Sequence, residues 1–344
     1  MPVKTSAIQF NLTVDDFDSL ITYPEQSQWT TPDPSASPPN PGLDIWFDST
    51  YHRTNVSGAS FSFNFTGPRI YLYGTSGPAF GSYAISIDGH KSEHSAHASA
   101  NSSRHLLFSS DCLTYAPHVL EVTNLGAKAA HEGGDLLIDY LEAGVDLVPA
   151  GAELTNVTLQ ESDSRLVYTG NWTENVFNPA FSGGYSRYTN DANGTVSLTF
   201  NATAIFIFGD KTDRHGLYTV SLDSRPLQTF NGVSGCGGAF AHACEKDNTL
   251  AFFAANLDAR EHRVTVTNVP GELGAYFDLD AIVLTEISTY LPAPRTHGRG
   301  LVARSLFGGE QAAVADLSFV GLSASLAMVL FFVLFGALRR LGRY

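Results

Sequence analysis

Cysteine, methionine and charged side chains are all scarce in this chain. Its 344 residues include three cysteines and two methionines, and 16% of them are charged. No Cys-x-x-Cys pair occurs, which argues against a metal site built on sulfur. The charges are mainly acidic and give a formal net charge of -14. Because an acidic surface is repelled by phosphate backbones, nucleic acid is excluded as an expected partner.

Familiar catalytic motifs are also missing. GTSGP (74–78) is not the Gly-x-Ser-x-Gly turn of a nucleophilic serine, and HEGGD (131–135) lacks the second histidine of a zinc-protease helix. His118 and His262 recur before similar strands, which favours a structural role for both. Nothing in the sequence places two carboxylates in a glycosidase cleft. We therefore predict no enzymatic activity and no required cofactor.

The N-terminus has no apolar stretch typical of a signal peptide, whereas the C-terminus has a long one. Residues 317–337 form an uncharged segment, followed by Arg339, Arg340 and Arg343. An uncharged stretch of this length predicts a helix that spans the lipid bilayer, and the arginines indicate its cytoplasmic side. We therefore expect a cytoplasmic tail at 338–344, with the rest of the chain extracellular or luminal. A cytosolic tail-anchored protein is the alternative topology.

Eight Asn-x-Ser/Thr triplets favour the external topology. Chance would give roughly three in a chain of this composition. Glycosylation in the secretory pathway would require a leader upstream of residue 1, because none is visible here. The predicted N-glycosylation sites are Asn11, Asn55, Asn64, Asn101, Asn156, Asn171, Asn193 and Asn201.

The three cysteines fit an oxidising compartment. Cys236 and Cys244 lie eight residues apart in the glycine-rich stretch SGCGGAFAHAC. This spacing predicts a loop disulfide, with two free thiols as the alternative. Cys112 is left over, and we expect it to be buried.

The region before the membrane segment contains an internal repeat. Five blocks match in the same order: FTGPRIYLYG (65–74) with FNATAIFIFG (200–209), GSYAISIDG (81–89) with GLYTVSLDS (216–224), HVLEVTN (118–124) with HRVTVTN (262–268), DLLIDYL (135–141) with YFDLDAI (276–282), and ITYPEQSQW (21–29) with LVYTGNW (166–172). A period of about 140 residues is too long for a solenoid, so each copy should be a complete domain.

Each block alternates between apolar and polar residues. Phe61, Phe63 and Phe65 share one face of SFSFNF, and similar period-two patterns recur between Gly, Pro, Asn and Asp clusters. Such patterns predict half-buried strands. The expected fold class is all-β, with two tandem antiparallel β-sandwiches of jelly-roll type and one C-terminal transmembrane helix. The predicted units are 6–147, 153–289, a juxtamembrane stalk at 290–316 and the helix at 317–337.

These strand blocks resemble the galactose-binding-domain-like β-sandwich. More narrowly, the chain is similar to tandem-repeat single-pass membrane proteins of basidiomycete fungi, most of which are uncharacterised. The resemblance covers nearly all of the region before residue 290. It implies a fold, but this fold hosts many functions.

The resemblance also implies a structural calcium ion. In related carbohydrate-binding modules, an acid near the first strand and an aspartate in the last strand hold the ion. The matching acids are Asp15, Asp16 and Asp139 in the first copy, with Asp18 beside them, and Glu161, Asp163 and Asp280 in the second. The alternative is that these acids cap turns and strand ends.

Aromatic residues near loops suggest glycan recognition, because sugar rings stack on exposed aromatic faces. Trp46, Tyr51 and Tyr185 are the candidates, whereas Trp29 and Trp172 share one repeat position and should pack in the cores. The first hypothesis is therefore a membrane-anchored module that binds carbohydrate or cell-wall glycan through its loops. The second is an adhesive ectodomain that binds protein or itself, without glycan or catalysis. Gly321 and Ser325 are spaced for helix pairing, which is consistent with self-association.

Overall fold

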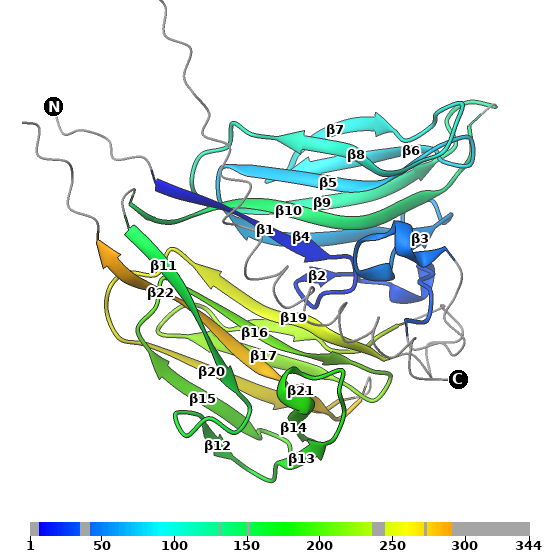
Figure 1. Ribbon diagram of the computed structural model, residues 1–344. Coiled ribbons are helices and arrows are strands. Elements are labelled where there is room, and N and C mark those ends of the chain that lie inside the picture. The colour runs from blue at the N-terminus through cyan, green and yellow to red at the C-terminus, as the bar shows by residue number, and fades with distance from the viewer. Residues whose placement is uncertain are drawn as a thin grey trace, which may run out of the picture.

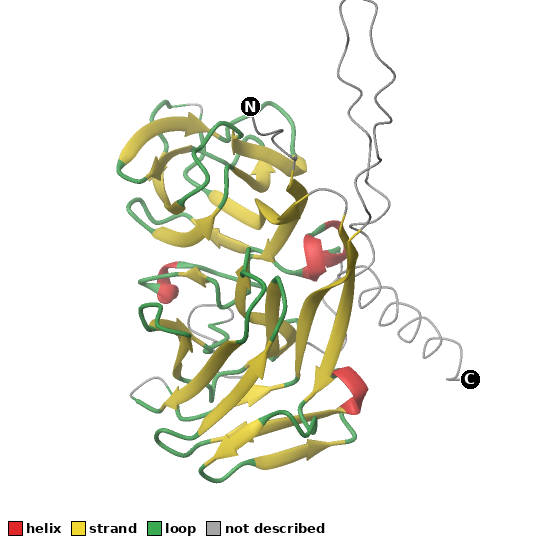
Figure 2. Ribbon diagram, turned by 90° about the vertical axis from the view of Figure 1, so that its left-hand side faces the viewer, coloured by secondary structure: helices red, strands yellow, loops and turns green. Residues whose placement is uncertain are grey.

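The computed structural model describes residues 7–34, 42–130, 132–149, 152–235, 245–271 and 274–290. Within these ranges the chain is almost entirely strands and loops (Figure 1). The only helical segments there are four three-residue 3-10 turns, drawn in red in Figure 2: η1 (Gln26–Gln28), η2 (Leu43–Ile45), η3 (Phe47–Ser49) and η4 (Ser182–Gly184). The prediction of an all-β protein with antiparallel sheets is confirmed.

Ten strands form the first repeat. They are β1 (Ala7–Asp15), β2 (Ile21–Thr22), β3 (His52–Thr54), β4 (Ser60–Thr66), β5 (Arg69–Ser76), β6 (Ser82–Ile87), β7 (His90–Ser95), β8 (Ser102–Ser110), β9 (Pro117–Gly126) and β10 (Leu136–Pro149). One sheet has the order β1-β10-β5-β8, with β3 also paired to β10, and the other has the order β2-β4-β9-β6-β7.

Twelve strands form the second repeat. They are β11 (Ala152–Gln160), β12 (Val167–Thr169), β13 (Thr173–Val176), β14 (Tyr185–Thr189), β15 (Thr195–Phe200), β16 (Ala204–Lys211), β17 (Leu217–Leu222), β18 (Gln228–Asn231), β19 (Lys246–Ala255), β20 (His262–Val269), β21 (Phe277–Leu279) and β22 (Ala281–Tyr290). The orders β11-β22-β16-β19 and β12-β15-β20-β17-β18 reproduce those of the first repeat. A third sheet, β13-β14-β21, closes one end.

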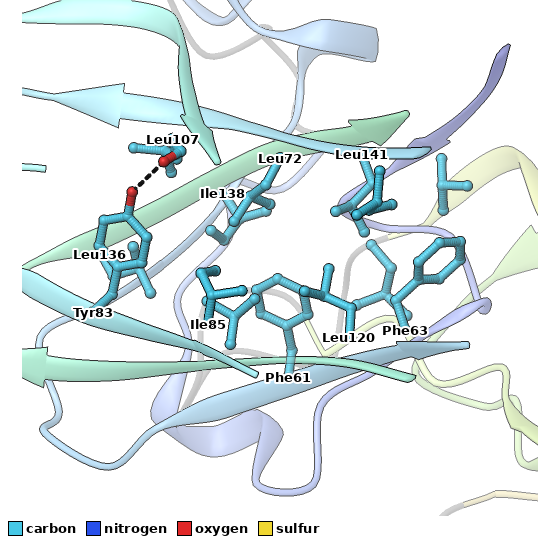
Figure 3. Packing of buried hydrophobic residues seen from close by; sticks show 14 of the residues in the cluster. Phe61, Phe63, Leu72, Tyr83, Ile85, Leu107, Leu120, Leu136, Ile138 and Leu141 are labelled. Carbon is cyan, nitrogen blue, oxygen red and sulfur yellow. Dashed lines mark hydrogen bonds between the residues drawn. The ribbon is translucent and has the colours of Figure 1, made fainter. Parts of the chain in front are cut away.

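The alternating residues form the cores that their period of two predicts. Phe61, Phe63 and Tyr83 from one sheet of the first repeat face Leu72 and Leu141 from the other (Figure 3). All five side chains are buried. The Tyr83 hydroxyl donates a hydrogen bond to the Leu107 carbonyl at 2.5 Å. Apolar burial between the two sheets is the main stabilising term, at about 25 cal/mol per Å² removed from water.

Side chains at matching positions make the same contacts in both repeats. Tyr218, the counterpart of Tyr83, donates to the Ala251 carbonyl at 2.8 Å. The Tyr23 hydroxyl donates to the Asp16 carbonyl and the Tyr168 hydroxyl to the Glu161 carbonyl, at 2.9 and 2.6 Å. These paired contacts set the residue correspondence used below.

The recurring histidines fasten one strand to the hairpin beside it. Nδ1 of His118 lies 2.6 Å from Asp88, and Nδ1 of His262 lies 2.8 Å from Asp223. In each ring Nε2 faces a main-chain carbonyl, that of Thr114 or Asp258. Because both ring nitrogens are engaged in each copy, these histidines serve the structure.

Several sequence predictions fall outside the described residues. They are the Cys236–Cys244 disulfide, the stalk beyond Tyr290, the helix at 317–337 and the tail. Among the residues that the structure describes, no helix is long and apolar enough to cross a membrane.

Cys112 lies within the described part, and the expectation that it is buried was wrong. Its thiol is exposed and donates to Asp111 Oδ1 at 3.1 Å. Cys112 follows β8 in the loop before β9, where no sheet covers it.

All eight predicted glycosylation asparagines are exposed. Asn64 lies within β4 but points away from the core, because its apolar neighbours Phe63 and Phe65 take the inner face. Every sequon is thus accessible, and their modification stays a prediction.

Candidate functional site

The two repeats meet through the ends of β16 and β19, where two lysines face the first repeat. Lys211 and Lys246 are paired directly across these antiparallel strands, so their side chains share one face. Both lysines are buried, at 4% and 8% exposure. Two adjacent ammonium groups would repel one another in a buried site. The first repeat supplies the opposite charge.

The negative charges next to these lysines come from three aspartates of the first repeat: Asp48, Asp15 and Asp18. The Lys246 ammonium forms an ion pair and a hydrogen bond with the Asp48 carboxylate, and Lys211 lies over the Phe17 ring at 5.5 Å. Burial lowers the pKa of Lys246, but Asp48 and Asp15 raise it more, to about 12.

Hydrogen bonds between side chains and the main chain also cross this junction. Asp18 Oδ1 accepts the Leu250 N–H at 2.6 Å, and Gln26 Nε2 donates to the Ser234 carbonyl at 3.0 Å. Burial raises the pKa of Asp18 to about 7, although the hydrogen bonds from the Leu250 and Asp15 N–H groups and the charge of Lys246 oppose the shift. Nearby, Phe10 packs edge-on against Phe206 with 6.2 Å between ring centroids. The repeats are therefore joined by a buried polar cluster beside an apolar contact.

A second acidic cluster lies on the other side of the same strand ends, inside the second repeat. One carboxylate oxygen from each of Asp210, Glu245 and Asp247 lies within 4.8 Å of the other two. Asp210 ends β16 next to Lys211, and Glu245 and Asp247 flank Lys246. Since side chains alternate along a strand, the lysines and these acids point to opposite faces.

Asp278 on β21 completes this cluster. A Cβ on Gly209 would lie 2.4 Å from the Asp278 carbonyl, so glycine is what allows β16 and β21 to approach here. Burial first, and then Asp278, Glu245 and Asp247, raise the pKa of Asp210 well above its ordinary value. Burial likewise raises the pKa of Asp278, with Asp280, Asp247 and Glu245 adding to it. This is a buried site where negative charge is concentrated.

The first repeat has neutral residues at the corresponding places. Ser76 pairs with Ser102 where Lys211 pairs with Lys246. The same registers match Asp210 with Thr75, Asp247 with Ser103 and Glu245 with Asn101. Asp278 matches Leu137, since Gly74 meets the Leu137 carbonyl as Gly209 meets that of Asp278. The fold can therefore be built without these four acids.

The acids that the resemblance implied for calcium are divided between different partners. In the first repeat, Asp16 binds Thr50 through Oδ1 and His52 through Oδ2, and Asp139 Oδ1 accepts the Phe47 N–H at 2.7 Å. Asp15 and Asp16 also face the positive charges of Lys246 and Lys211. These residues thus lie beside two lysines, and a calcium ion held by them stays a prediction.

In the second repeat, the acids that the resemblance implied for calcium do not all lie together. Both carboxylate oxygens of Asp163 bind Arg165, each at 2.9 Å. Glu161 and Asp280 are buried near one another, and Asp280 Oδ1 accepts the Ser182 N–H at 2.9 Å. Asp280 is thus close to the acidic cluster, whereas Asp163 is paired with Arg165.

Exposed aromatic rings stand on the loop beside this cluster. Phe177 is 83% exposed and Tyr185 is 37% exposed, with ring centroids 6.0 Å apart. Phe177 has a φ of 61°, a left-handed conformation that costs energy for a bulky residue. Ser182 binds Asp280, and the buried Ser186 donates to Asp278 Oδ2 at 2.8 Å. The loop that carries the aromatic pair is thereby fixed to the acids beneath it.

Trp46 and Tyr51 lie on the corresponding loop of the first repeat. Their rings meet edge-on with centroids 5.3 Å apart, and both are half-buried against the core. Trp29 is buried, and Trp172 packs beside Tyr168. Of the three sequence candidates, Tyr185 has the freest ring, and the structure adds Phe177 next to it.

Five residues of this site were not predicted from the sequence: Phe177, Asp210, Glu245, Asp247 and Asp278. One signal was available: IFIFGDK ends in two charges where the first copy, IYLYGTS, ends in neutral residues. The two copies therefore differ in charge at the end of this strand, and that difference coincides with the acidic cluster.

One curated protein and several solved structures are similar to parts of this chain. No protein-family model matches the chain. A Flavonifractor plautii protein named "A type blood alpha-D-galactosamine galactosaminidase" is 24% identical over 214 residues, which are 62% of this chain and 18% of that protein. The chain therefore spans only a small part of this curated relative.

Solved structures give remote similarities. A Paenibacillus xanthan lyase has 13% identity and a TM-score of 0.28, covering 83% of this chain and 27% of its own. A family 35 carbohydrate binding module from Clostridium thermocellum has 13% identity and a TM-score of 0.27, covering 37% and 98%. The ANXUR2 extracellular domain from Arabidopsis thaliana has 8% identity and a TM-score of 0.25, covering 82% and 97%.

The prediction that excluded enzymes was wrong. The curated relative is named as an enzyme, a galactosaminidase, and the missing motifs belong to other catalytic classes. Glycan-processing enzymes work with carboxylates drawn from separate parts of the chain, so they leave no short motif to be found. The proteins to which this chain is similar include glycan-active and glycan-binding ones.

Proposed function

We propose that this chain recognises a glycan through the loop end of its second repeat, as part of a glycan-active system. The observation that carries the proposal is the exposed pair of Phe177 and Tyr185. An apolar ring face and nearby polar groups are what a sugar needs, because its C–H face stacks while its hydroxyls form hydrogen bonds.

The strained backbone of Phe177 supports this role. A left-handed φ at a phenylalanine costs energy, and its exposed ring recovers little of that cost through burial. Such strain is typical of residues kept for binding rather than for packing. The galactosaminidase similarity independently favours a glycan as the ligand.

The proposal includes the finer architecture and location predicted from sequence. Each repeat would be a jelly-roll sandwich of the galactose-binding-like type. The segment at 317–337 would hold the chain on a membrane with both repeats outside, where glycans are found. The relation to tandem-repeat fungal membrane proteins belongs to the same proposal.

A glycan array tests the proposal, with α-D-galactosamine-terminated oligosaccharides among its ligands. Phe177→Gly removes the ring and also relieves the left-handed strain, so the variant should fold at least as well as the wild type. We expect it to lose roughly five- to tenfold in affinity, since stacking contributes about 1–1.5 kcal/mol. Tyr185→Ala should weaken binding in the same direction.

Leu227→Ala is the matched control, because Leu227 is also an exposed apolar residue, at 62%, but lies before β18. It should bind as the wild type does. Equal binding by the wild type and Phe177→Gly would contradict the aromatic site. An array without any ligand would contradict glycan recognition. Release of reducing sugar from bound oligosaccharides, measured alongside, reports on catalysis.

A further inference from the structure

The acidic cluster of the second repeat gathers carboxyl groups in a largely buried site. Among the described residues, no lysine or arginine forms an ion pair with Asp210, Asp247 or Asp278. Asp210 is paired with His215, whose Nε2 lies 3.3 Å from Oδ1.

Two carboxyl groups of the cluster have a buried oxygen without a hydrogen-bond partner. Asp278 is 4% exposed, and its Oδ1 has no hydrogen-bond partner, while its Oδ2 binds Ser186. Asp247 Oδ1 is also buried without a partner. A buried carboxylate oxygen left in this state is costly unless a proton or a cation meets it.

The spacing of the oxygens fits one cation. Two ligands that each lie 2.3–2.6 Å from a common calcium ion can be at most about 5 Å apart. The nearest oxygens of Asp210, Glu245 and Asp247 lie within 4.8 Å of one another. A set made only of oxygens favours a hard cation, and calcium accepts irregular, partly bidentate geometries that magnesium does not.

We propose that Asp210, Glu245 and Asp247 bind a calcium ion in the second repeat, next to the buried carboxyl group of Asp278. This site differs from the Glu161, Asp163 and Asp280 set implied by the sequence resemblance. It is independent of the glycan proposal. The first repeat, with Thr75, Asn101, Ser103 and Leu137 at the matching positions, would have no such site.

The ion would tie together three strands that otherwise meet at a point of repulsion. It would hold the start of β19, and with it Lys246 at the repeat junction. Through Asp278 and Ser186 it would also fix β14, the strand that begins with Tyr185. We therefore expect the cation to stabilise both the junction and the aromatic loop.

The test uses the full chain, stripped with EGTA and then titrated with calcium alone. Calorimetry should show binding, and the Tm should rise by roughly 5 °C at a hundredfold excess over Kd. Asp210→Asn and Asp247→Asn should each lose that rise. In EGTA both variants should melt above the wild type, because each removes one of the repelling charges.

Asp163→Asn is the control, since Asp163 is committed to Arg165, and it should keep the full calcium response. If Asp210→Asn fails to fold, Glu245→Gln at the half-buried edge replaces it. The proposal is overturned if calcium produces neither heat nor a Tm shift in the wild type. It is equally overturned if Asp163→Asn removes the response while Asp210→Asn and Asp247→Asn keep it.

Discussion

The two repeats share their scaffold and differ in the charge at one end of it. Buried asparagines illustrate the shared part: Asn124 donates to the Val56 and Gly134 carbonyls, and Asn268 donates to those of Asp191 and Ala275. The difference in charge includes the ends of two strands, where Ser76 and Ser102 of the first repeat correspond to Lys211 and Lys246 of the second.

This difference distinguishes polar contacts that the fold requires from polar residues that it does not require. Contacts present in both copies, such as Tyr83 with Leu107 and Tyr218 with Ala251, are required by the fold. The extra lysines and acids of the second copy are not, because the first copy folds with neutral residues there. The lysines pair with acids of the first repeat at the junction, whereas the acids of the second copy gather in a separate cluster.

The largest effect should come from the junction. Lys246→Met leaves Asp48, Asp15 and Asp18 without the cation that they face. Removing one partner of a buried charge pair typically costs about 3–5 kcal/mol. We expect a loss of that size in the free energy of unfolding, measured by urea denaturation at pH 8, where the remaining acids are more ionised.

Lys128→Met provides the contrast. Lys128 pairs with Glu93 on the surface, where both side chains are exposed, and such pairs contribute below about 1 kcal/mol. If the two variants lost equal stability, the junction cluster would not have the role assigned to it.

An intermediate effect tests the equivalence of the copies. Tyr83→Phe and Tyr218→Phe each remove one hydroxyl from a buried hydrogen bond to a carbonyl. Each should destabilise the protein by about 1 kcal/mol, as expected for one such bond. Melting curves of the two variants should therefore shift alike. A shift in only one of them would show that the shared contact matters to a single repeat.

The smallest effect concerns pH. Burial lowers the pKa of His118, but the Asp88 carboxylate and the Thr114 carbonyl raise it more, so it lies above its ordinary value. A group with a raised folded pKa binds more protons in the folded state. Its stabilisation is therefore complete below the ordinary histidine pKa and is lost as pH rises through the folded value.

The measurement compares Tm from pH 5.5 to 8.5 for the wild type and Asp88→Asn. The wild type should lose slightly more Tm over this range, because only its His118 has the carboxylate partner. Parallel curves would argue against an ion pair at this position.

Local pattern was enough to predict the strands. Phe61, Phe63 and Phe65 alternate with polar residues, and only one face of a sheet can bury them. The IDG sequence at 87–89 is typical of a hairpin turn, and Asp88 and Gly89 adopt φ values of 52° and 84° where β6 joins β7.

The aromatic candidates were predicted less well. Tyr185 is exposed, but Trp46 and Tyr51 pack against the core. Phe177, the most exposed of these rings, was not among the predicted residues. Exposure of a loop residue depends on what the rest of the chain places over it, and sequence spacing does not record that.

The sequence by itself determined the duplication, the all-β class and the buried face of each strand, because these follow from local periodicity. Only the tertiary structure decided which charges meet. Asp48 and Lys246 are 198 residues apart and form one ion pair, and Asp210 meets Asp278 because Gly209 lets two strands approach. Charge interactions act through space, so a cluster drawn from separate strands and separate repeats becomes apparent only when the chain is folded.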